Sequence, residues 1–591
     1  MDRVERSENH CGAVGRRSIL KVLSAAGVGS AVFGRAVVAL AADKAPITAK
    51  MLQQAEWISG LTLSDEKRKM MLDGLSEAAG DYTRLRAVTI DNSVPPAVQF
   101  AADPFQAHGQ PAGRGRVVPI ETSPGRLPAS PEDLAFARVH ELGPLIRDRQ
   151  ISSRELTRLY LDRLATYDPV LRCVITLTRD LALAQADRAD RAIAAGEYRG
   201  PLHGIPWGAK DLLSVPGYRT TWGAAPYKDQ QRPETATAAR RLEDAGAVLV
   251  AKTSLGALAW GDVWFDATTK NPWNKEQGSS GSSAGSASAT AAGLVGFALG
   301  TETLGSIVSP STRCGATGLR PTFGRVSRHG AMALSWSMDK IGPITRSVED
   351  CALVFSALHG ADGLDPAAVD RPFSWPFRRD IRTLRVGYVP DLFEDTRAEG
   401  IEDEEARERF LEWREFDRRT LKELEGLGLD LVPIELPSTY PVDALGLILT
   451  AEAATAFDEL TRSGKDDLLT RQIENAWPNV FRLGQMIPAV EYLRANRIRH
   501  LVMREMEDLM KQVDLYVTPS FGGVNLLLTN LTGHPQVVLP NGFRASDGTP
   551  TSITFTGRLY GETELLAVAH AYQEATGFHL RRPPMETLKT S

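Results

Sequence analysis

The sequence has few cysteines, and none of them is spaced as a metal ligand. Cys11, Cys173, Cys314 and Cys351 are the only four in 591 residues. No CxxC pair or Cys/His ligand pattern occurs, so a zinc site or a redox pair has no support. We therefore expect no metal and no cofactor. The three cysteines that would remain after N-terminal processing are expected to be buried free thiols.

The sequence also lacks an excess of positive charge and a long apolar run. Its formal net charge is −5, so no global basic field exists to hold nucleic acid. No stretch beyond the extreme N-terminus is long and apolar enough to span a bilayer, so we expect no stable membrane insertion after processing. The composition is that of a soluble globular protein, and the length allows one large catalytic domain or two to three domains.

Residues 1–41 have the composition of a targeting segment rather than of a folded element. Arg16 and Arg17 precede a weakly apolar run over 22–34, and Ala39-Leu-Ala41 offers small residues to a signal peptidase. The stretch 15–21 resembles a twin-arginine export signal, S/T-R-R-x-F-L-K, with Gly15 and Ile19 as departures. An uncleaved anchor is the alternative, but the run is too short and rich in glycine. The resemblance implies a periplasmic or secreted protein.

The rest of the chain divides by its pattern into three parts. Residues 42–131 contain a helical segment, in which Ser64 can cap a helix, and a connector rich in Pro, Gly and Ala. Residues 132–583 alternate short apolar runs with helical stretches, which is typical of an α/β domain. The runs expected to be strands are 247–252, 384–390, 431–436 and 515–519. Residues 584–591 are expected to be a C-terminal tail.

A serine- and glycine-rich tract at 277–286 allows three interpretations. It could be a flexible linker, but an Ala-rich helical segment follows it directly. It also contains G-x-S-x-G with Ser283 as the nucleophile of a serine hydrolase, which requires a buried strand just before it and a histidine base. The preceding stretch 271–277 is polar and contains proline, so it is a poor strand. His534, His570 and His579 lie downstream, but nothing around them marks one as a base.

The third interpretation joins three separated motifs. Residues 200–211 contain G-x-P-x-x-x-K-D with Lys210. Ser282 lies in the serine-rich tract, and 24 residues later Gly300-Thr-Glu-Thr-Leu-Gly-Ser-Ile307 contains Ser306. These motifs, with further blocks at 314–330, 337–350 and 532–543, resemble the amidase signature family over roughly residues 132 to 583. The resemblance implies an α/β fold in which a large central mixed β-sheet is covered by helices on both faces.

The resemblance also implies an amidase that hydrolyses a carbon–nitrogen amide bond through an acyl-enzyme. Lys210 would take a proton from Ser282, Ser282 would take one from Ser306, and Ser306 would attack the carbonyl. The Gly281–Ser282 peptide bond would be cis. Because a lysine acts as a base only when it is neutral, burial must lower the pKa of Lys210 by several units. Its apolar neighbours in the sequence favour this.

The turn that holds Ser306 is where we expect the oxyanion site. Backbone N–H groups of Thr303, Leu304, Gly305 and Ser306 would converge at the start of a short helix. The family has Asp at Glu302, Gly at Leu304 and Arg at Val308. We expect that Glu302 has lost a pairing residue, and that the turn uses allowed geometry at Leu304 or a shifted backbone.

The expected partner is a small-molecule amide, which the sequence does not identify, and a homodimer is left open. Trp260, Trp264 and Phe265 form an aromatic cluster where relatives often line the acyl pocket, whereas core packing is at least as good an account of Trp273. An alternative function is a component of the tRNA-dependent amidotransferase, which releases ammonia from glutamine with the same three residues. The export signal argues against it, because charged tRNA is cytoplasmic.

Overall fold

The computed structural model describes residues 46–90, 94, 96–98, 117–119, 127–394, 398 and 400–589. The predicted signal at 1–41 and most of the predicted connector lie outside these residues. The chain divides into two compact units between Gly80 and Asp81. Among the described residues no helix is both long and apolar enough to cross a membrane.

The N-terminal unit contains helix α3 (Ala49–Ser59) and the first part of α4 (Asp65–Ala87). As expected, Ser64 precedes the first turn of α4, and its Oγ accepts a hydrogen bond from the backbone N–H of Lys67 at 3.3 Å. A buried ion pair between Arg68 and Glu56 (2.5 Å) joins the two helices. Glu56 also accepts the backbone N–H of Leu63, so it fixes the turn between them.

The second unit is built on an 11-stranded sheet with the order β1-β3-β2-β6-β8-β7-β12-β13-β11-β9-β10. The strands are β1 (Val174–Leu177), β2 (Pro206–Lys210), β3 (Val248–Thr253), β6 (Phe297–Glu302), β7 (Thr317–Arg320), β8 (Lys340–Thr345), β9 (Arg385–Tyr388), β10 (Asp430–Pro433), β11 (Leu515–Pro519), β12 (Gln536–Phe543) and β13 (Pro550–Gly557). The sheet is mixed: β2 pairs in parallel with β3 and β6, whereas β8 pairs antiparallel with β6 and β7.

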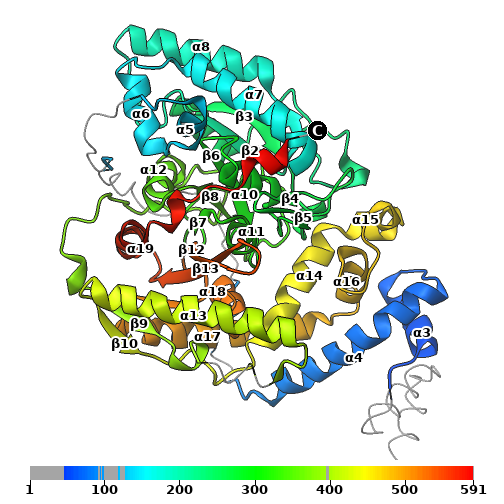
Figure 1. Ribbon diagram of the computed structural model, residues 1–591. Helices are drawn as coiled ribbons and strands as arrows, with labels where there is room; N and C mark the ends of the chain where they lie inside the picture. Colours follow the sequence, from blue (N-terminus) through cyan, green and yellow to red (C-terminus); the bar gives the residue numbers. More distant parts are fainter. Residues whose placement is uncertain are drawn as a thin grey trace, which may run out of the picture. The chain divides into compact units, whose positions relative to one another are not determined.

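Helices cover both faces of this sheet, so its central strands are buried along their whole length (Figure 1). The helices are α5 (Pro131–Phe136), α6 (Val139–Arg147), α7 (Ser153–Leu171), α8 (Arg179–Ala194), α9 (Thr237–Asp244), α10 (Ala284–Ala291), α11 (Val308–Cys314), α12 (Val348–Leu358), α13 (Glu404–Gly426), α14 (Leu447–Ala456), α15 (Asp458–Arg462), α16 (Trp477–Gly484), α17 (Ala489–Gln512), α18 (Asn525–Thr532) and α19 (Glu562–Thr576). The expected α/β fold with helices on both faces is therefore confirmed.

Two short helices matter most for the site, because they follow the two serine motifs. Helix α10 packs against β6, β2 and β8, and α11 packs against β7, β12 and β13. Every residue of α10 is buried, and most of them are Ala, Ser or Gly. A Cβ added to Gly285 would lie 2.2 Å from the carbonyl oxygen of Cys173, so only glycine allows this close approach. The serine-rich tract is thus packed structure and not a linker.

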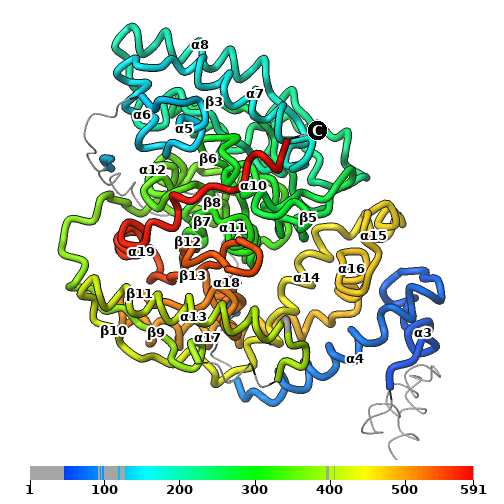
Figure 2. The backbone as a smooth tube through the Cα atoms, viewed as in Figure 1, coloured from blue at the N-terminus to red at the C-terminus, as the bar shows by residue number. Residues whose placement is uncertain are grey.

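The C-terminal residues also belong to the packed structure. Met585 and Leu588 are buried in a cluster with Leu161, Leu164 and other residues of α7. Figure 2 shows the last segment, in red, returning across the molecule toward that helix. The described part of the stretch 584–591 is therefore held against the core.

The four expected strands coincide with β3, β9, β10 and β11, within one to three residues. One expectation was wrong. The polar stretch 271–277 does form a strand, β5 (Asn274–Gly278), which pairs with β4 (Lys270–Asn271) in a separate two-stranded ribbon. Because this ribbon lies outside the central sheet and is partly exposed, it does not need an apolar sequence. Cys173, Cys314 and Cys351 are buried free thiols, as predicted.

Candidate active site

Lys210 is the last residue of β2 and is completely buried. Its Nζ donates hydrogen bonds to Ser282 Oγ (2.8 Å), Ser283 Oγ (3.0 Å) and Thr301 Oγ1 (2.8 Å). Three hydroxyl groups therefore surround the amine, and no carboxylate bonds it in the described part of the chain. Its sequence neighbour Asp211 pairs instead with Lys252, at 2.6 Å.

Burial lowers the pKa of Lys210 from 10.5 to about 7. Removal from water disfavours the charged ammonium, and the negative charges of Asp339 and Glu302 oppose this effect only in part. The lowered pKa that the chemistry requires is thus present in the structure. At neutral pH a large fraction of the side chain is neutral and able to accept a proton.

Ser282 lies in the loop that leads into α10, and its preceding peptide bond, Gly281–Ser282, is cis, as the resemblance implied. Ser283 is turned toward β6. Its Oγ donates to the carbonyl oxygen of Thr301 and accepts the Thr301 N–H, each at 3.1 Å. Ser283 therefore fixes the loop to the sheet, and Ser282 is left with Lys210 as its partner.

Ser306 lies in the turn between β6 and α11 and is 9% exposed. The backbone N–H of Ser283 donates to the carbonyl oxygen of Ser306 at 3.1 Å, which holds the two serine segments together. Gly305 adopts the left-handed conformation (φ 85°), whereas Leu304 does not. Leu304 therefore has a backbone conformation that any residue can adopt, and the left-handed position of the turn is occupied by Gly305.

The backbone N–H groups of this turn separate into two sets. Those of Ile307 and Val308 donate to Glu302 Oε2, at 2.8 and 3.0 Å. Within the described structure, the N–H groups of residues 303–306 donate to no protein acceptor. The four donors expected for the oxyanion are therefore available. Thr303 is held separately, because its Oγ1 donates to Asp339 Oδ1 at 2.6 Å.

Glu302 has a pairing residue in place of the arginine that is absent at Val308. Arg320, at the end of β7, donates from Nη1 to Glu302 Oε1 at 2.6 Å, and both side chains are fully buried. Asn530 of α18 donates to the same oxygen at 3.0 Å. Motif reading missed these partners because they come from elements that are 18 and 228 residues away in the sequence.

The aromatic residues at 260–273 separate by their surroundings. Trp264 is buried, and its ring packs edge-on against Phe265 with centroids 5.0 Å apart. Trp260 is half-buried, and its neighbour Gly261 lies directly against Gly281, where a Cβ would come within 1.8 Å of the Gly261 oxygen. Trp273 bonds the carbonyl oxygen of Cys314, which is a packing contact. Of the aromatic residues predicted for the pocket, Trp260 is therefore the one whose sequence neighbour contacts the segment of Ser282.

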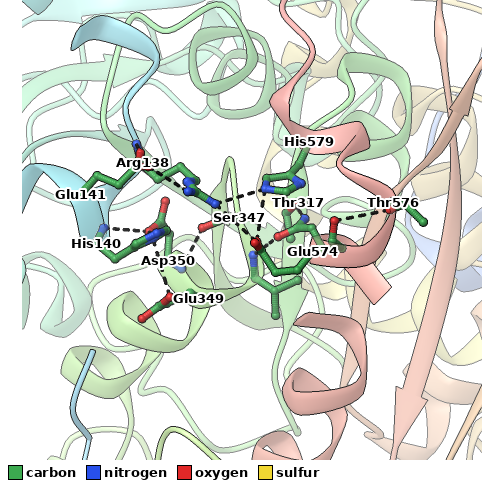
Figure 3. A network of polar contacts seen from close by, with 12 residues as sticks. Arg138, His140, Glu141, Thr317, Ser347, Glu349, Asp350, Glu574, Thr576 and His579 are labelled. Atoms are coloured by element: carbon green, nitrogen blue, oxygen red, sulfur yellow. Dashed lines mark hydrogen bonds and ion pairs between the residues drawn. The ribbon is translucent and has the colours of Figure 1, made fainter. Parts of the chain in front are cut away.

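The three histidines considered as bases for Ser283 lie in other contacts. His534 shares a hydrogen bond with Thr532, His570 packs edge-on against Trp375, and His579 faces Arg138. Figure 3 shows the last of these in a network with Glu141 and Glu574. In the described structure none of the three bonds Ser283, whose Oγ contacts Lys210 and Thr301 instead, so the G-x-S-x-G interpretation lacks its histidine base.

Two cavities are lined by residues that adjoin the two serine segments, but neither wall includes Lys210, Ser282 or Ser306. One has a volume of about 730 Å³ and is lined by Ser280, Ser309, Trp413 and Phe521, among others. The hydroxyls of Ser280 and Ser309 lie 2.8 Å apart, next to Gly281 and one turn after Ser306. The other, of about 860 Å³, has Asp339 in its wall. Either volume is sufficient for a small organic molecule.

Comparison with known proteins agrees with this geometry. The family model "Amidase" matches residues 155–524. The chain belongs to the amidase family. A glutamyl-tRNA(Gln) amidotransferase subunit of Moorella thermoacetica is 34% identical over 497 residues, which is 77% of this chain and 99% of the relative. The protein of the same name from Heliobacterium modesticaldum is 33% identical over 494 residues, or 76% of this chain and 98% of that relative.

A solved structure with the same fold is the peptide amidase of Stenotrophomonas maltophilia. It is 29% identical, the TM-score is 0.65, and the match covers 76% of this chain and 98% of the peptide amidase. An amidase family protein of Bacillus anthracis matches with 25% identity and a TM-score of 0.66, over 77% of this chain and 93% of that one. This member of the family thus shares its fold with a peptide amidase and with another amidase family protein.

Proposed function

We propose that the protein is an exported serine amidase in which Lys210, Ser282 and Ser306 carry out the hydrolysis of a carbon–nitrogen amide bond. The observation that carries the proposal is the 2.8 Å hydrogen bond between Lys210 Nζ and Ser282 Oγ in a fully buried setting. An amide is a poor electrophile, so its attack needs an activated nucleophile and a proton for the departing nitrogen.

We propose a proton relay that runs from Ser306 through Ser282 to Lys210, supported by the bond between Lys210 and Ser282 and by the backbone bond between Ser283 and Ser306. Neutral Lys210 takes the proton of Ser282 Oγ, and Ser282 takes the proton of Ser306 Oγ as this oxygen attacks the carbonyl carbon. The C–N bond then breaks, and the proton returns through Ser282 to the leaving nitrogen. Water next attacks the ester carbonyl of the acyl-enzyme, releases the carboxylic acid and restores the Ser306 hydroxyl. Protons and electrons balance without a metal or a cofactor.

The oxyanion that forms during attack needs donors that are not already used. The N–H groups of Thr303, Leu304, Gly305 and Ser306 meet this condition, whereas those of Ile307 and Val308 are bonded to Glu302. We assign the oxyanion site to the first four. Loss of one donor from an oxyanion site typically costs about 3 kcal/mol of transition-state stabilisation.

Covalent labelling tests the proposal without knowledge of the substrate. A fluorophosphonate should modify Ser306, as read by peptide mass spectrometry, and Lys210→Met should lose this reaction while remaining folded. Absence of labelling in a folded wild-type protein would overturn the proposal. A panel of free amides, peptide amides and anilides would then define the substrate class.

A second candidate is suggested by the names of the relatives: one component of an amidotransferase, which would release ammonia from glutamine. Such a protein would work beside charged tRNA in the cytoplasm, whereas we propose that residues 1–41 direct this protein out of it. Glutamine hydrolysis that depends on a co-purified partner would favour this candidate. Hydrolysis of simple amides by the isolated chain would favour the free-standing amidase.

The export part of the proposal rests on Arg16 and Arg17 and is tested separately. Changing both to Lys should retain the protein in the cytoplasmic fraction, whereas the unchanged chain should reach the periplasm and lose its N-terminal segment. N-terminal sequencing of the exported protein would locate the cleavage site. A cytoplasmic location of the unchanged chain would remove the argument against the second candidate.

A further inference from the structure

Glu302 closes β6 and faces the start of α11, and one of its oxygens holds that helix start. Oε2 accepts the backbone N–H groups of Ile307 and Val308, the two residues that follow Ser306 directly. The first N–H groups of a helix have no partner within the helix and need an acceptor from elsewhere. Ile307, at the N-cap position, has no side chain that could serve. Glu302 supplies this acceptor from the preceding strand.

The other oxygen of Glu302 is held by two further elements. Oε1 accepts Arg320 Nη1 from β7 and Asn530 Nδ2 from α18. These partners are themselves fixed, because Arg320 Nη2 donates to the carbonyl oxygen of His534 and Asn530 Nδ2 donates to that of Leu526. The carboxylate thus joins β6, β7, α11 and α18 at the point where Ser306 is presented.

Glu302 stays ionised throughout this arrangement. Burial alone would raise the pKa of its carboxyl, but the charge of Arg320 and the donated hydrogen bonds lower it to about 2. A buried carboxylate with four donors, one of them an arginine, is a fixed group and not a titrating one in the working range of the enzyme. Its geometry is therefore constant across any pH profile above about pH 4.

We infer that Glu302 is a positioning residue for the nucleophile: through Ile307 and Val308 it fixes the backbone that presents Ser306, and it leaves only the N–H groups of residues 303–306 for the oxyanion. This inference rests on the proposed role of Ser306. It assigns to Glu302, Arg320 and Asn530 one common role, that of anchoring the nucleophile turn. A small displacement of a catalytic group can cost on the order of 100-fold in rate.

Glu302 also acts on Lys210 through its charge. Its negative charge favours the protonated form of Lys210 and so raises the pKa of this lysine against the effect of burial. Removing the charge, and leaving Arg320 positive, must lower the pKa of Lys210. The neutral form would then persist to lower pH. A residue with a purely structural role would not move this titration, so the two roles can be separated.

The test compares Glu302→Gln, Glu302→Asp and Glu562→Gln by the rate of fluorophosphonate labelling at Ser306 between pH 5 and 9. Glu562 is a matched control, because it is buried, accepts the Thr322 N–H at 3.0 Å and lies beside Arg325, yet it contacts none of the three proposed catalytic residues. Thermal unfolding and circular dichroism establish that each variant is folded.

Glu302→Gln should reduce the plateau rate by about 10- to 100-fold and shift the acidic limb of the profile to lower pH. Glu302→Asp keeps the charge, so the pH of its acidic limb should be unchanged. Its plateau rate should fall, because the shorter side chain cannot reach both α11 and Arg320. Glu562→Gln should change neither. If Glu302→Gln does not fold, Asn530→Ala removes one donor to the same carboxylate and should lower the plateau with an unchanged limb.

A Glu302→Gln protein that reacts at the wild-type rate with an unshifted limb would overturn the inference. The inference would also be overturned if Glu302→Gln and Glu562→Gln both lowered the plateau rate and neither shifted the acidic limb. That result would mean a general structural loss. Failure of the proposed function has a different signature. In that case the wild-type protein is not labelled at Ser306, or Lys210→Met is labelled equally fast, whatever the Glu302 variants do.

Discussion

Protonation of Lys210 should control the acylation of Ser306, and the structure gives the pH at which this happens. With a pKa of about 7, about half of the lysine is neutral at pH 7 and about 1% at pH 5. The base works only when neutral, so the rate should fall about tenfold for each pH unit below 7 and level off above about pH 8. An exposed lysine with its usual pKa of about 10.4 would instead give a rate still rising at pH 9.

The assay is the second-order rate of fluorophosphonate labelling at Ser306, measured from pH 5 to pH 9 and corrected for hydrolysis of the reagent. Lys210→Met should react about 10²- to 10⁴-fold more slowly and show no limb near pH 7. Lys340→Met is the control, because Lys340 is also buried with a strongly lowered pKa, but its Nζ donates to the carbonyl oxygen of Met338. The reasoning would be refuted if the labelling rate of the wild-type protein did not change with pH. It would also be refuted if the acidic limb disappeared in Lys340→Met and persisted in Lys210→Met.

The same lowered pKa makes a prediction about stability. Folding holds Lys210 at a pKa of about 7 instead of 10.5, so below pH 7 the buried charge costs about 5 kcal/mol. Between pH 7 and 10.5 the unfolded chain binds the proton and the folded chain does not, so this cost shrinks as the pH rises. Lys210→Met should therefore unfold at a higher temperature than the wild-type protein at pH 6, with a difference that narrows by pH 9. Loss of the hydrogen bonds from Lys210 Nζ to Ser282, Ser283 and Thr301 reduces the gain. A lower unfolding temperature at pH 6 would contradict the prediction.

Further predictions concern the residues around the relay. Ser282→Ala should reduce labelling by about 10²- to 10⁴-fold, whereas Ser283→Ala removes only bonds to Lys210 and Thr301 and should cost about tenfold or less; equal losses would contradict the assignment of the bridge. Trp264→Ala should lower the free energy of unfolding by about 3–5 kcal/mol in chemical denaturation. Trp260→Ala should cost less stability and should change the preference among amides, and the opposite result would move the pocket to Trp264. Gly305→Ala should slow labelling, because its φ of 85° and the Leu526 side chain 3.0 Å from a new Cβ both oppose a side chain there. Leu304→Gly should leave labelling intact, since Leu304 needs no left-handed backbone.

The sequence motifs predicted the contact between Lys210 and Ser282, and they placed Ser306 in the turn whose backbone is bonded to Ser283. They also predicted four strands of the sheet, of which β3 and β11 are buried along their whole length. The strand order was not predictable, since β8 inserts between β6 and β7 without any local signal. The ribbon β4–β5 was missed because an exposed two-stranded pair does not have the apolar alternation of a core strand.

The partners of Glu302 show most clearly what the local sequence leaves out. Val308 stands where the family has arginine, and the sequence around Ser306 therefore indicated that Glu302 had lost a pairing residue. The fold supplies Arg320 from a strand two positions away in the sheet and Asn530 from a helix near the C-terminus. A buried carboxylate without a cation would be protonated or would destabilise the fold, so a partner had to exist even though no motif named it. Burial and charge balance thus constrain the turn that presents Ser306 more strongly than the identity of any one residue within the motif.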